Sequence, residues 1–266
     1  MHLLRLYLAF SKVNFLTQME YRTQYFLRMV TKTIAWLTGF ILISVLLYRF
    51  RAISGWSTYE VLFLYTLDVL SYSLAATFFL SPFQNLSRNI RLGMFDEVLT
   101  KPVNPLLYYM CTKTSAGYVN NYIISVVVLG LCFKNLQIKL TVAKLIALVI
   151  VLLGATLIQS AAFMLTNIPA FWLVKSNSLY RLFFSNITGF LQYPLSIYNR
   201  SVQIFLTFIL PYAFVNYYPA QYFLGKEEYL FHPLFQYLTP LVGVLFFTLA
   251  YFLWKLGINN YQSTGS

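Results

Sequence analysis

Long apolar stretches, separated by short polar ones, run through most of this 266-residue chain. A helix that crosses a membrane needs about 20 predominantly apolar residues. The apolar segments, of which one is clearly shorter than the rest, are 29–48, 60–80, 116–133, 145–166, 178–193 and 233–254. This pattern predicts an all-α integral membrane protein with six transmembrane helices, the second of which is stopped by Ser81 and Pro82.

The first 28 residues combine apolar side chains with a polar stripe. Ser11, Asn14, Gln18 and Arg22 recur at helical spacing and form this stripe. Such a pattern is typical of a helix that lies along the membrane surface. We therefore predict an interfacial helix over 1–28; the alternative is the cytosolic end of a long first span.

Prolines interrupt the aromatic and apolar segment 194–224. Pro194, Pro211 and Pro219 each lack the backbone N–H of a helical residue and clash with the preceding turn. Broken backbone at membrane depth is tolerated where it is buried in protein or lines a watery cavity. We predict a re-entrant helical hairpin that enters from the outer face, with a kinked ordinary span as the alternative.

Composition narrows the class of protein. Apolar residues make up 59 % of the chain and charged residues 10 %, with a mean hydropathy of +0.66. A soluble fold carries about 25 % charged residues and could not bury this much apolar surface. These values exclude a soluble enzyme, a secreted disulfide scaffold and a disordered protein.

The distribution of charge predicts the orientation of the chain. The net charge is +12, and basic residues are scattered between apolar segments, as expected for loops that face anionic lipid headgroups rather than nucleic acid. With an even number of spans, twelve of the 19 Lys and Arg residues fall on the side of the termini. The positive-inside rule then predicts cytosolic termini and a cytosolic 81–115 segment.

The sequence contains no catalytic or metal-binding pattern. Cys111 and Cys132 form no CxxC pair, His2 and His232 lie far apart, and HExxH, GxSxG and phosphate-binding-loop motifs do not occur. We therefore expect no catalytic centre, no metal site and no cofactor in this chain, and no hydrolysis of ATP by the chain itself.

Two features inside the apolar segments invite a functional interpretation. Asp68 is the one acidic residue well within a predicted span, and an ionisable group there is a functional candidate. Its alternatives are a hydrogen-bonded structural role, with Tyr65 and Tyr72 as partners, or a place on a transport path. An aromatic cluster could likewise face a bulky or cationic amphiphile or simply anchor the chain at the interface; it contains Tyr212, Phe214, Tyr217, Tyr218, Tyr222 and Phe223.

Small residues mark one face of the 145–166 segment. Ala147, Gly154 and Ala161 recur at intervals of seven residues. Small side chains let two helix backbones approach closely, so this face is predicted to pack tightly within the chain or against a partner.

The polar stretch 89–106, Asn-Ile-Arg-Leu-Gly-Met-Phe-Asp-Glu-Val-Leu-Thr-Lys-Pro-Val-Asn-Pro-Leu, is the most informative part of the chain. Gly93, an amphipathic turn and the pair Pro102 and Pro105 describe a short helix across the membrane surface, with charged residues free to meet a soluble partner. The alternative is a solvated loop with ordinary caps.

This stretch resembles the cytosolic coupling region of type-2 ABC exporter permeases, in particular a six-span prokaryotic group that includes viologen exporters. Further matches, which run in order to the end of the chain, are Glu20-Tyr21-Arg22, the 193–198 segment Tyr-Pro-Leu-Ser-Ile-Tyr, the 210–220 segment Leu-Pro-Tyr-Ala-Phe-Val-Asn-Tyr-Tyr-Pro-Ala, and the tail from Trp254 to Ser266. Each match is weak alone; together they indicate the family and say nothing of the substrate.

The resemblance implies a single transmembrane permease domain over 1–266 in a prokaryotic cytoplasmic membrane. It also implies two permease chains, identical or different, above a pair of cytosolic ABC ATPase subunits that bind ATP and Mg. The residues expected at the ATPase are Arg88, Arg91, Gly93, Phe95, Asp96, Leu99, Lys101 and Pro102. Those expected on the substrate path are Asp68, Tyr72, Tyr212, Tyr217 and Tyr218.

Three functions compete at this point. The first is the permease subunit of an ATP-driven exporter whose substrate is amphipathic: a drug-like cation, a lipid or a peptide. The second is a secondary transporter driven by an ion gradient, which the single intramembrane acid and the lack of visible internal repeats disfavour. The third is a membrane enzyme that acts on a lipid, which the missing catalytic residues disfavour.

Overall fold

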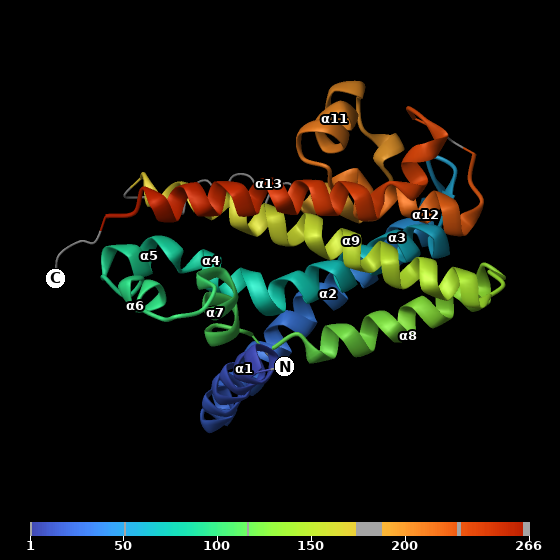
Figure 1. Ribbon diagram of the computed structural model, residues 1–266. Coiled ribbons are helices and arrows are strands. Elements are labelled where there is room, and N and C mark those ends of the chain that lie inside the picture. The colour runs from blue at the N-terminus through green and yellow to red at the C-terminus, as the bar shows by residue number, and fades with distance from the viewer. Residues whose placement is uncertain (1, 51, 116, 174–187, 228–229, 263–266) are drawn as a thin grey trace.

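The structure is a computed structural model that describes residues 2–50, 52–115, 117–173, 188–227 and 230–262. It is almost entirely helical (Figure 1), apart from a two-residue-strand hairpin formed by β1 (Ala52–Ile53) and β2 (Trp56–Ser57). The fold is therefore all-α, as the apolar pattern predicted.

Within the described residues, four helices are long and apolar enough to cross a membrane. They are α2 (Arg22–Phe50), α3 (Thr58–Ala75) with its continuation to Arg91, α9 (Val142–Asn167) with η2 (Ile168–Phe171), and α13 (Thr239–Asn259). A shorter apolar helix, α8 (Val119–Asn135), lies at the predicted third span. Most of the predicted 178–193 helix lies outside the described residues, so six spans stay a prediction.

The second apolar helix does not stop at Pro82, contrary to the prediction from Ser81 and Pro82. Instead the chain passes through a π-helical turn, η1 (Ala76–Leu80), into the short helices α4 (Ser81–Gln84) and α5 (Leu86–Arg91). A π turn widens the helix and accommodates the missing N–H of a proline. The Ser115 N–H, which lies outside this helix, donates a hydrogen bond to the carbonyl of Thr77 at 2.8 Å.

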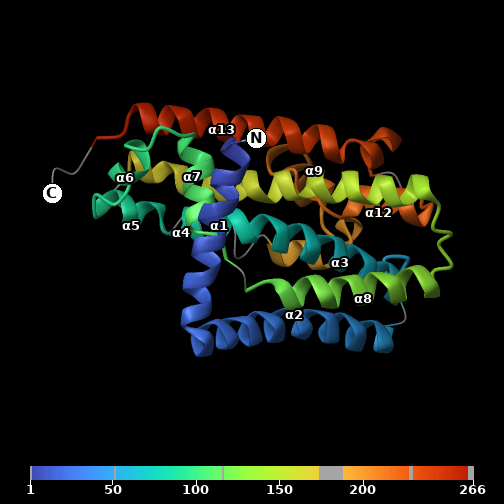
Figure 2. The same cartoon turned by 60° about the horizontal axis from the view of Figure 1, so that its bottom comes forward.

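The N-terminal helix α1 (His2–Glu20) meets α2 at a turn at Tyr21 and runs across the other long helices (Figure 2). The turn comes seven residues earlier than the predicted end of the interfacial helix at residue 28. Helix α1 packs on α7 (Pro105–Thr112), where the rings of Phe10 and Tyr108 meet edge to face at 5.1 Å. Its direction favours a helix separate from α2 over one continuous first span.

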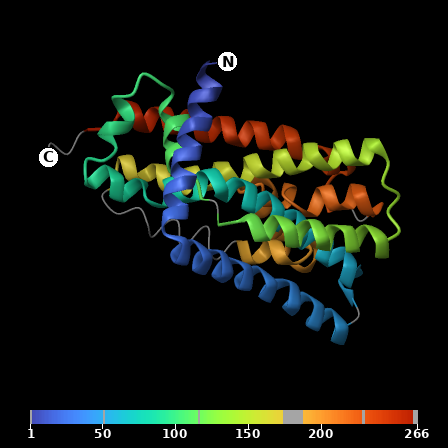
Figure 3. The same ribbon diagram turned by 90° about the horizontal axis from the view of Figure 1, so that it is seen from below.

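Helix α3 is the central element, with α2, α8 and α9 around it (Figure 3). Helices α9 and α13 form the tightest pair, because Gly154 and Gly243 bring their backbones into direct contact. A Cβ atom built on Gly154 would lie 2.7 Å from the Cα of Pro240. The predicted small-residue face thus packs within the chain, against the last long helix.

The segment 194–224 is broken into short helices, as its prolines predicted. Two arms, α11 (Arg200–Ile204) with η6 (Phe205–Ile209) and α12 (Tyr217–Leu224), are joined through η7 (Tyr212–Phe214). The hydroxyls of Thr207 and Tyr218 hydrogen-bond at 3.0 Å and connect the arms. The flanking 3₁₀ turns are η4 (Thr188–Gln192), η5 (Leu195–Ile197) and η8 (Pro233–Tyr237). Because η8 occupies 233–237, the last long helix begins at Thr239 rather than at 233.

The described C-terminal end lies at the end of the long helices that carries α5 and α6 (Asp96–Leu99), and α1 crosses beside α7 (Figure 1). Tyr261, near the C-terminus, contacts Asp96, and Gln18 of α1 donates to the carbonyl of Thr114 at 2.6 Å. The β hairpin and α12 lie at the opposite end. The side of the membrane on which 81–115 and the termini lie stays a prediction.

Candidate coupling region and buried polar site

The candidate coupling region, residues 81–115, which is called the coupling region below, is a chain of short helices whose direction changes at Gly93. Its φ of +68° lies in the left-handed region that glycine adopts without strain. After this turn the Asp96 N–H bonds to the Gly93 carbonyl at 3.2 Å, and α6 begins. Asn104 then caps α7 with its side-chain oxygen, so Pro105 starts a helix rather than stopping one.

An aromatic cluster holds α6 to the ends of the long helices. It consists of Phe83, Phe95, Tyr109, Phe171, Trp254 and Tyr261. Phe95 and Trp254 are almost completely buried, and their rings lie 5.8 Å apart. Phe95 was expected at the ATPase surface. Its burial makes it an anchor of α6 to α13 instead, because its side chain is covered by this chain's own rings.

Hydrogen bonds reinforce the same connection. The Tyr261 hydroxyl donates to the Asp96 carboxylate at 2.7 Å, and the Tyr108 hydroxyl donates to Glu97 at 3.0 Å. Burial, together with the bond to Asp96, raises the pKa of Tyr261 to about 12. Burial and the bond to Glu97 also raise the pKa of Tyr108. Both phenols therefore stay neutral donors at physiological pH.

The outer side of the coupling region is basic and partly apolar. Arg88, Arg91, Lys101 and Pro102 are exposed, while Gly93, Asp96 and Leu99 are half-buried. Lys101 lies 3.8 Å from Glu97, an exposed pair that contributes little to stability. All the sequence-predicted coupling residues except Phe95 thus reach the surface of this region.

The structure adds two residues that sequence reasoning missed. Leu92 and Met94, on either side of Gly93, are 51 % and 55 % exposed. Together with Arg88 and Arg91 they form an exposed surface of apolar and basic side chains, which is called the tip below. The signal was present as two large apolar residues within an otherwise polar stretch.

Asp68 lies in a buried polar site between α3 and α9. Gln159 of α9 donates from its Nε2 to Asp68 Oδ1 at 2.9 Å, and Asp68 is 2 % exposed. The predicted partner Tyr65 donates instead to the carbonyl of Trp36 at 3.4 Å. Tyr72 packs on Trp36 and Phe163, with ring centroids 5.1 and 5.5 Å away. The site joins two helices, which favours the structural interpretation of Asp68.

The remaining substrate-path candidates are buried in the 194–224 segment and its surroundings. Tyr212, Tyr217 and Tyr218 are 1–2 % exposed. Tyr217 packs on Trp56 at 5.5 Å, and Tyr218 packs on Phe235 at 5.3 Å. These rings form a core between the broken helices and the β hairpin, rather than the open aromatic wall that their density suggested.

A family model described as an ABC-2 family transporter protein matches residues 33–265. The match begins within α2 and includes the coupling region, the broken segment and α13. No curated protein and no solved structure matches the chain.

Proposed function

The chain belongs to the ABC-2 transporter family, and from this premise we propose that it is the permease subunit of an ATP-driven exporter. Members of this family are membrane components that work with an ABC ATPase and are generally not catalytic themselves. The proposed substrate is an amphipathic drug-like cation, lipid or peptide. The complex would contain two permease chains and two ATPase subunits that bind ATP and Mg.

The observation that carries the proposal is the attachment of α6 to the long helices. Phe95 packs on Trp254 of α13 and, at 5.4 Å, on Phe171 at the end of α9. A force applied to α6 would therefore reach two long helices through closely packed rings rather than through a flexible loop. This is the mechanical connection that a permease needs if ATPase closure is to tilt its helices.

The exposed tip is the surface that we propose for ATPase docking. Arg88, Arg91, Leu92 and Met94 can place apolar and basic side chains in a groove, and Gly93 sets the turn. Lys101, Leu99 and Pro102 continue the surface, whereas Asp96 is held toward Tyr261. In this proposal 81–115 and both termini are cytosolic, α1 lies along the membrane surface, and 194–224 is a re-entrant hairpin.

The ion-gradient alternative depends on Asp68. A proton- or cation-coupling carboxylate has to exchange its ligand during transport, but Asp68 is buried and bound by Gln159. This arrangement supports a structural group more than a coupling group. The ATP-driven proposal therefore remains the better supported one.

The test is purification of the tagged chain from its native membrane in mild detergent, followed by mass spectrometry of stoichiometric partners. We expect a P-loop ATPase and one further permease copy or homologue. A chain that purifies alone and transports with an ion gradient would overturn the proposal.

A charge reversal at the tip tests the docking surface within the same complex. Arg91→Glu should weaken ATPase binding by at least about ten-fold, because charged interface groups contribute several kcal/mol when reversed. Lys139→Glu, an exposed reversal in the α8–α9 loop at the opposite end, is the matched control and should bind normally. Arg91 is a cleaner target than Asp96, whose bond to Tyr261 would also be lost.

A further inference from the structure

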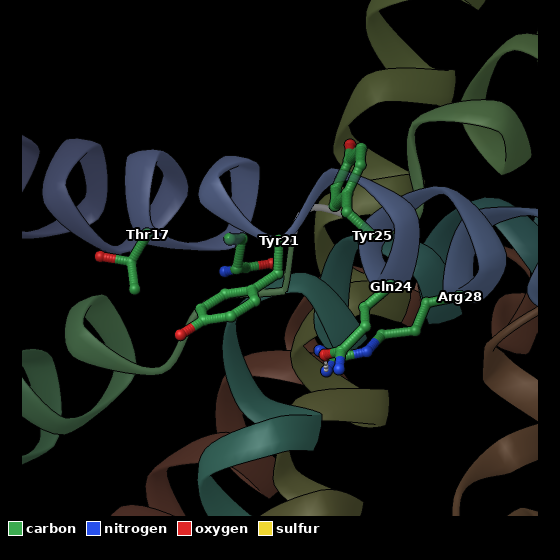
Figure 4. Close-up of a pocket in the computed structure, with 6 residues that line it drawn as sticks. Thr17, Tyr21, Gln24, Tyr25 and Arg28 are labelled. Atoms are coloured by element: carbon green, nitrogen blue, oxygen red, sulfur yellow. Dashed lines mark hydrogen bonds between the residues drawn. The ribbon is translucent and has the colours of Figure 1, made fainter.

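A small pocket lined by polar, aromatic and basic residues lies at the elbow between α1 and α2 (Figure 4). Its volume is about 150 Å³, and it is lined by Thr17, Gln18, Tyr21, Gln24, Tyr25 and Arg28. These residues recur every three or four positions across the turn at Tyr21, so both helices contribute to one face. Pockets for drug-sized ligands measure about 300–1,000 Å³, whereas this space suits a single compact polar group.

The side chains of the pocket favour a ligand with several oxygen acceptors. Arg28 donates from Nη2 to Gln24 Oε1 at 3.4 Å, and Figure 4 shows the ends of these two side chains together, with the Tyr21 ring directed away from them. Because the Gln24 oxygen accepts this bond, its Nε2 amide remains as a donor group. A guanidinium carries five N–H donors in all, and the Arg28 side chain is exposed. None of the six lining residues is acidic.

The charge of the two helices points to the same kind of ligand. Around the elbow, residues 12–32 contain four basic residues, Lys12, Arg22, Arg28 and Lys32, and one acidic residue, Glu20. A phosphate oxyanion is the anion that arginine binds with favourable fork geometry. The pocket is also fixed in place, because Gln18 donates to the carbonyl of Thr114.

The surroundings select a lipid as the source of the phosphate. Phe26 and Leu27, which lie between the pocket residues Tyr25 and Arg28 on α2, are each 58 % exposed. Under the proposed function, on which this argument rests, α1 lies along the membrane surface and α2 crosses it. Their elbow is then at headgroup depth, with exposed apolar side chains beside Arg28 on the same turn of α2.

We propose that the α1–α2 elbow is a binding site for an anionic phospholipid, whose phosphate is held by Arg28 and Gln24. Arg28 supplies the charge, and Gln24 orients the guanidinium and adds its amide donor. Phe26 and Leu27 contact the acyl chains. A bound lipid would fix the angle between α1 and α2.

The test is native mass spectrometry of the purified chain in nonionic detergent with added dioleoylphosphatidylglycerol. We expect a specific lipid adduct whose affinity falls about ten-fold in Arg28→Gln, the typical loss for a charge-assisted hydrogen bond. Arg22→Gln is the matched control, because Arg22 is an exposed arginine near the elbow that does not line the pocket. Its adduct should be unchanged. Gln24→Leu should weaken the adduct less than Arg28→Gln.

Three outcomes would overturn the proposal. Equal weakening by both arginine variants would indicate diffuse charge attraction, and no weakening by Arg28→Gln would remove the pocket from lipid binding. Displacement of the lipid by inorganic phosphate alone, at similar concentration, would indicate a site for free phosphate. The measurement needs no ATPase, so its failure is distinguishable from failure of ATPase copurification, which tests the proposed function.

Discussion

The two ends of the long helices are held together by different chemistry. At the end that carries α6, the aromatic cluster joins α6, α9 and α13 through large buried rings and neutral hydroxyl donors. At the opposite end, Lys226 connects to Glu60 at 3.2 Å, to the Gly55 carbonyl at 2.8 Å and to the face of Trp56. One end is joined by ring packing and neutral hydroxyl donors, whereas the other adds a partly buried cation to the ring packing of Trp56 and Tyr217.

This difference has a mechanical meaning. Ring packing resists compression and transmits displacement, because close-packed interiors leave no free space to absorb it. A lysine at the end of a flexible stem can keep its partners while the segments it joins shift. Under the proposed function, the cluster end is the one that receives the push from the ATPase, and the lysine end keeps a flexible contact. The following variants break or sharpen this contrast, in order of expected effect.

The largest loss should come from Trp254→Ala in the cluster. Trp254 is 1 % exposed and packs on four other rings, so its removal leaves a large cavity. We expect a loss of about 3–5 kcal/mol in unfolding free energy, measured by thermal unfolding in detergent. Trp172→Ala is the control, since Trp172 is 51 % exposed. Similar losses from both would contradict the role assigned to the cluster.

Gly243→Ala tests the close contact between α9 and α13, the two helices that run between the two ends. A Cβ on Gly243 would clash with the backbone of Gly154, and a backbone cannot move aside as a flexible side chain can. Separation of α9 from α13 should cost about 1–3 kcal/mol. Gly130→Ala in α8 is the matched control, because nothing lies within 4 Å of the new Cβ. It should stabilise the helix by up to about 1 kcal/mol, so the two variants should have opposite signs.

A smaller effect is expected from Lys226→Met at the lysine end. The Lys226 and Glu60 side chains are 14 % and 17 % exposed, so the lost pair leaves Glu60 largely buried, with the Ser57 N–H as a remaining donor. We expect a loss of about 2 kcal/mol, below the range for a fully buried pair. Lys139→Met, in the exposed α8–α9 loop, should change the unfolding temperature little. A loss as large as that of Trp254→Ala would erase the contrast between the ends.

The smallest change is Tyr261→Phe, which removes the hydroxyl that binds Asp96 but keeps the ring. The expected loss is about 1 kcal/mol, with packing in the cluster intact. Burial raises the pKa of Tyr261 from 10.0 to about 12, so the folded state retains this proton more strongly than the unfolded state does. The stabilisation is present below pH 10 and declines as the pH rises toward 12. Thermal unfolding of both proteins across this range should show their difference shrinking; a difference that grows would contradict the hydrogen bond.

Much of the architecture was available from the sequence, because lipid imposes simple requirements. A span must satisfy its own backbone and present apolar side chains, so four long helices could be located within several residues of their observed bounds. Prolines predicted the broken helices of 194–224 for the same reason. Helix ends were less predictable, since Pro82 is accommodated by a π turn and by the Ser115 N–H, which is distant in sequence.

For the candidate site, too, some features could be predicted from the sequence and others depend on the tertiary structure. The sequence by itself determined that the chain is a membrane protein, that 89–106 resembles a coupling region and that the chain turns at Gly93, because composition and local backbone preference are properties of short segments. Only the tertiary structure decided that Phe95 is an anchor, that Asp68 is bound by Gln159 and that Tyr217 and Tyr218 are core. Burial and partners depend on which distant helices pack against a residue, and no local pattern encodes that choice.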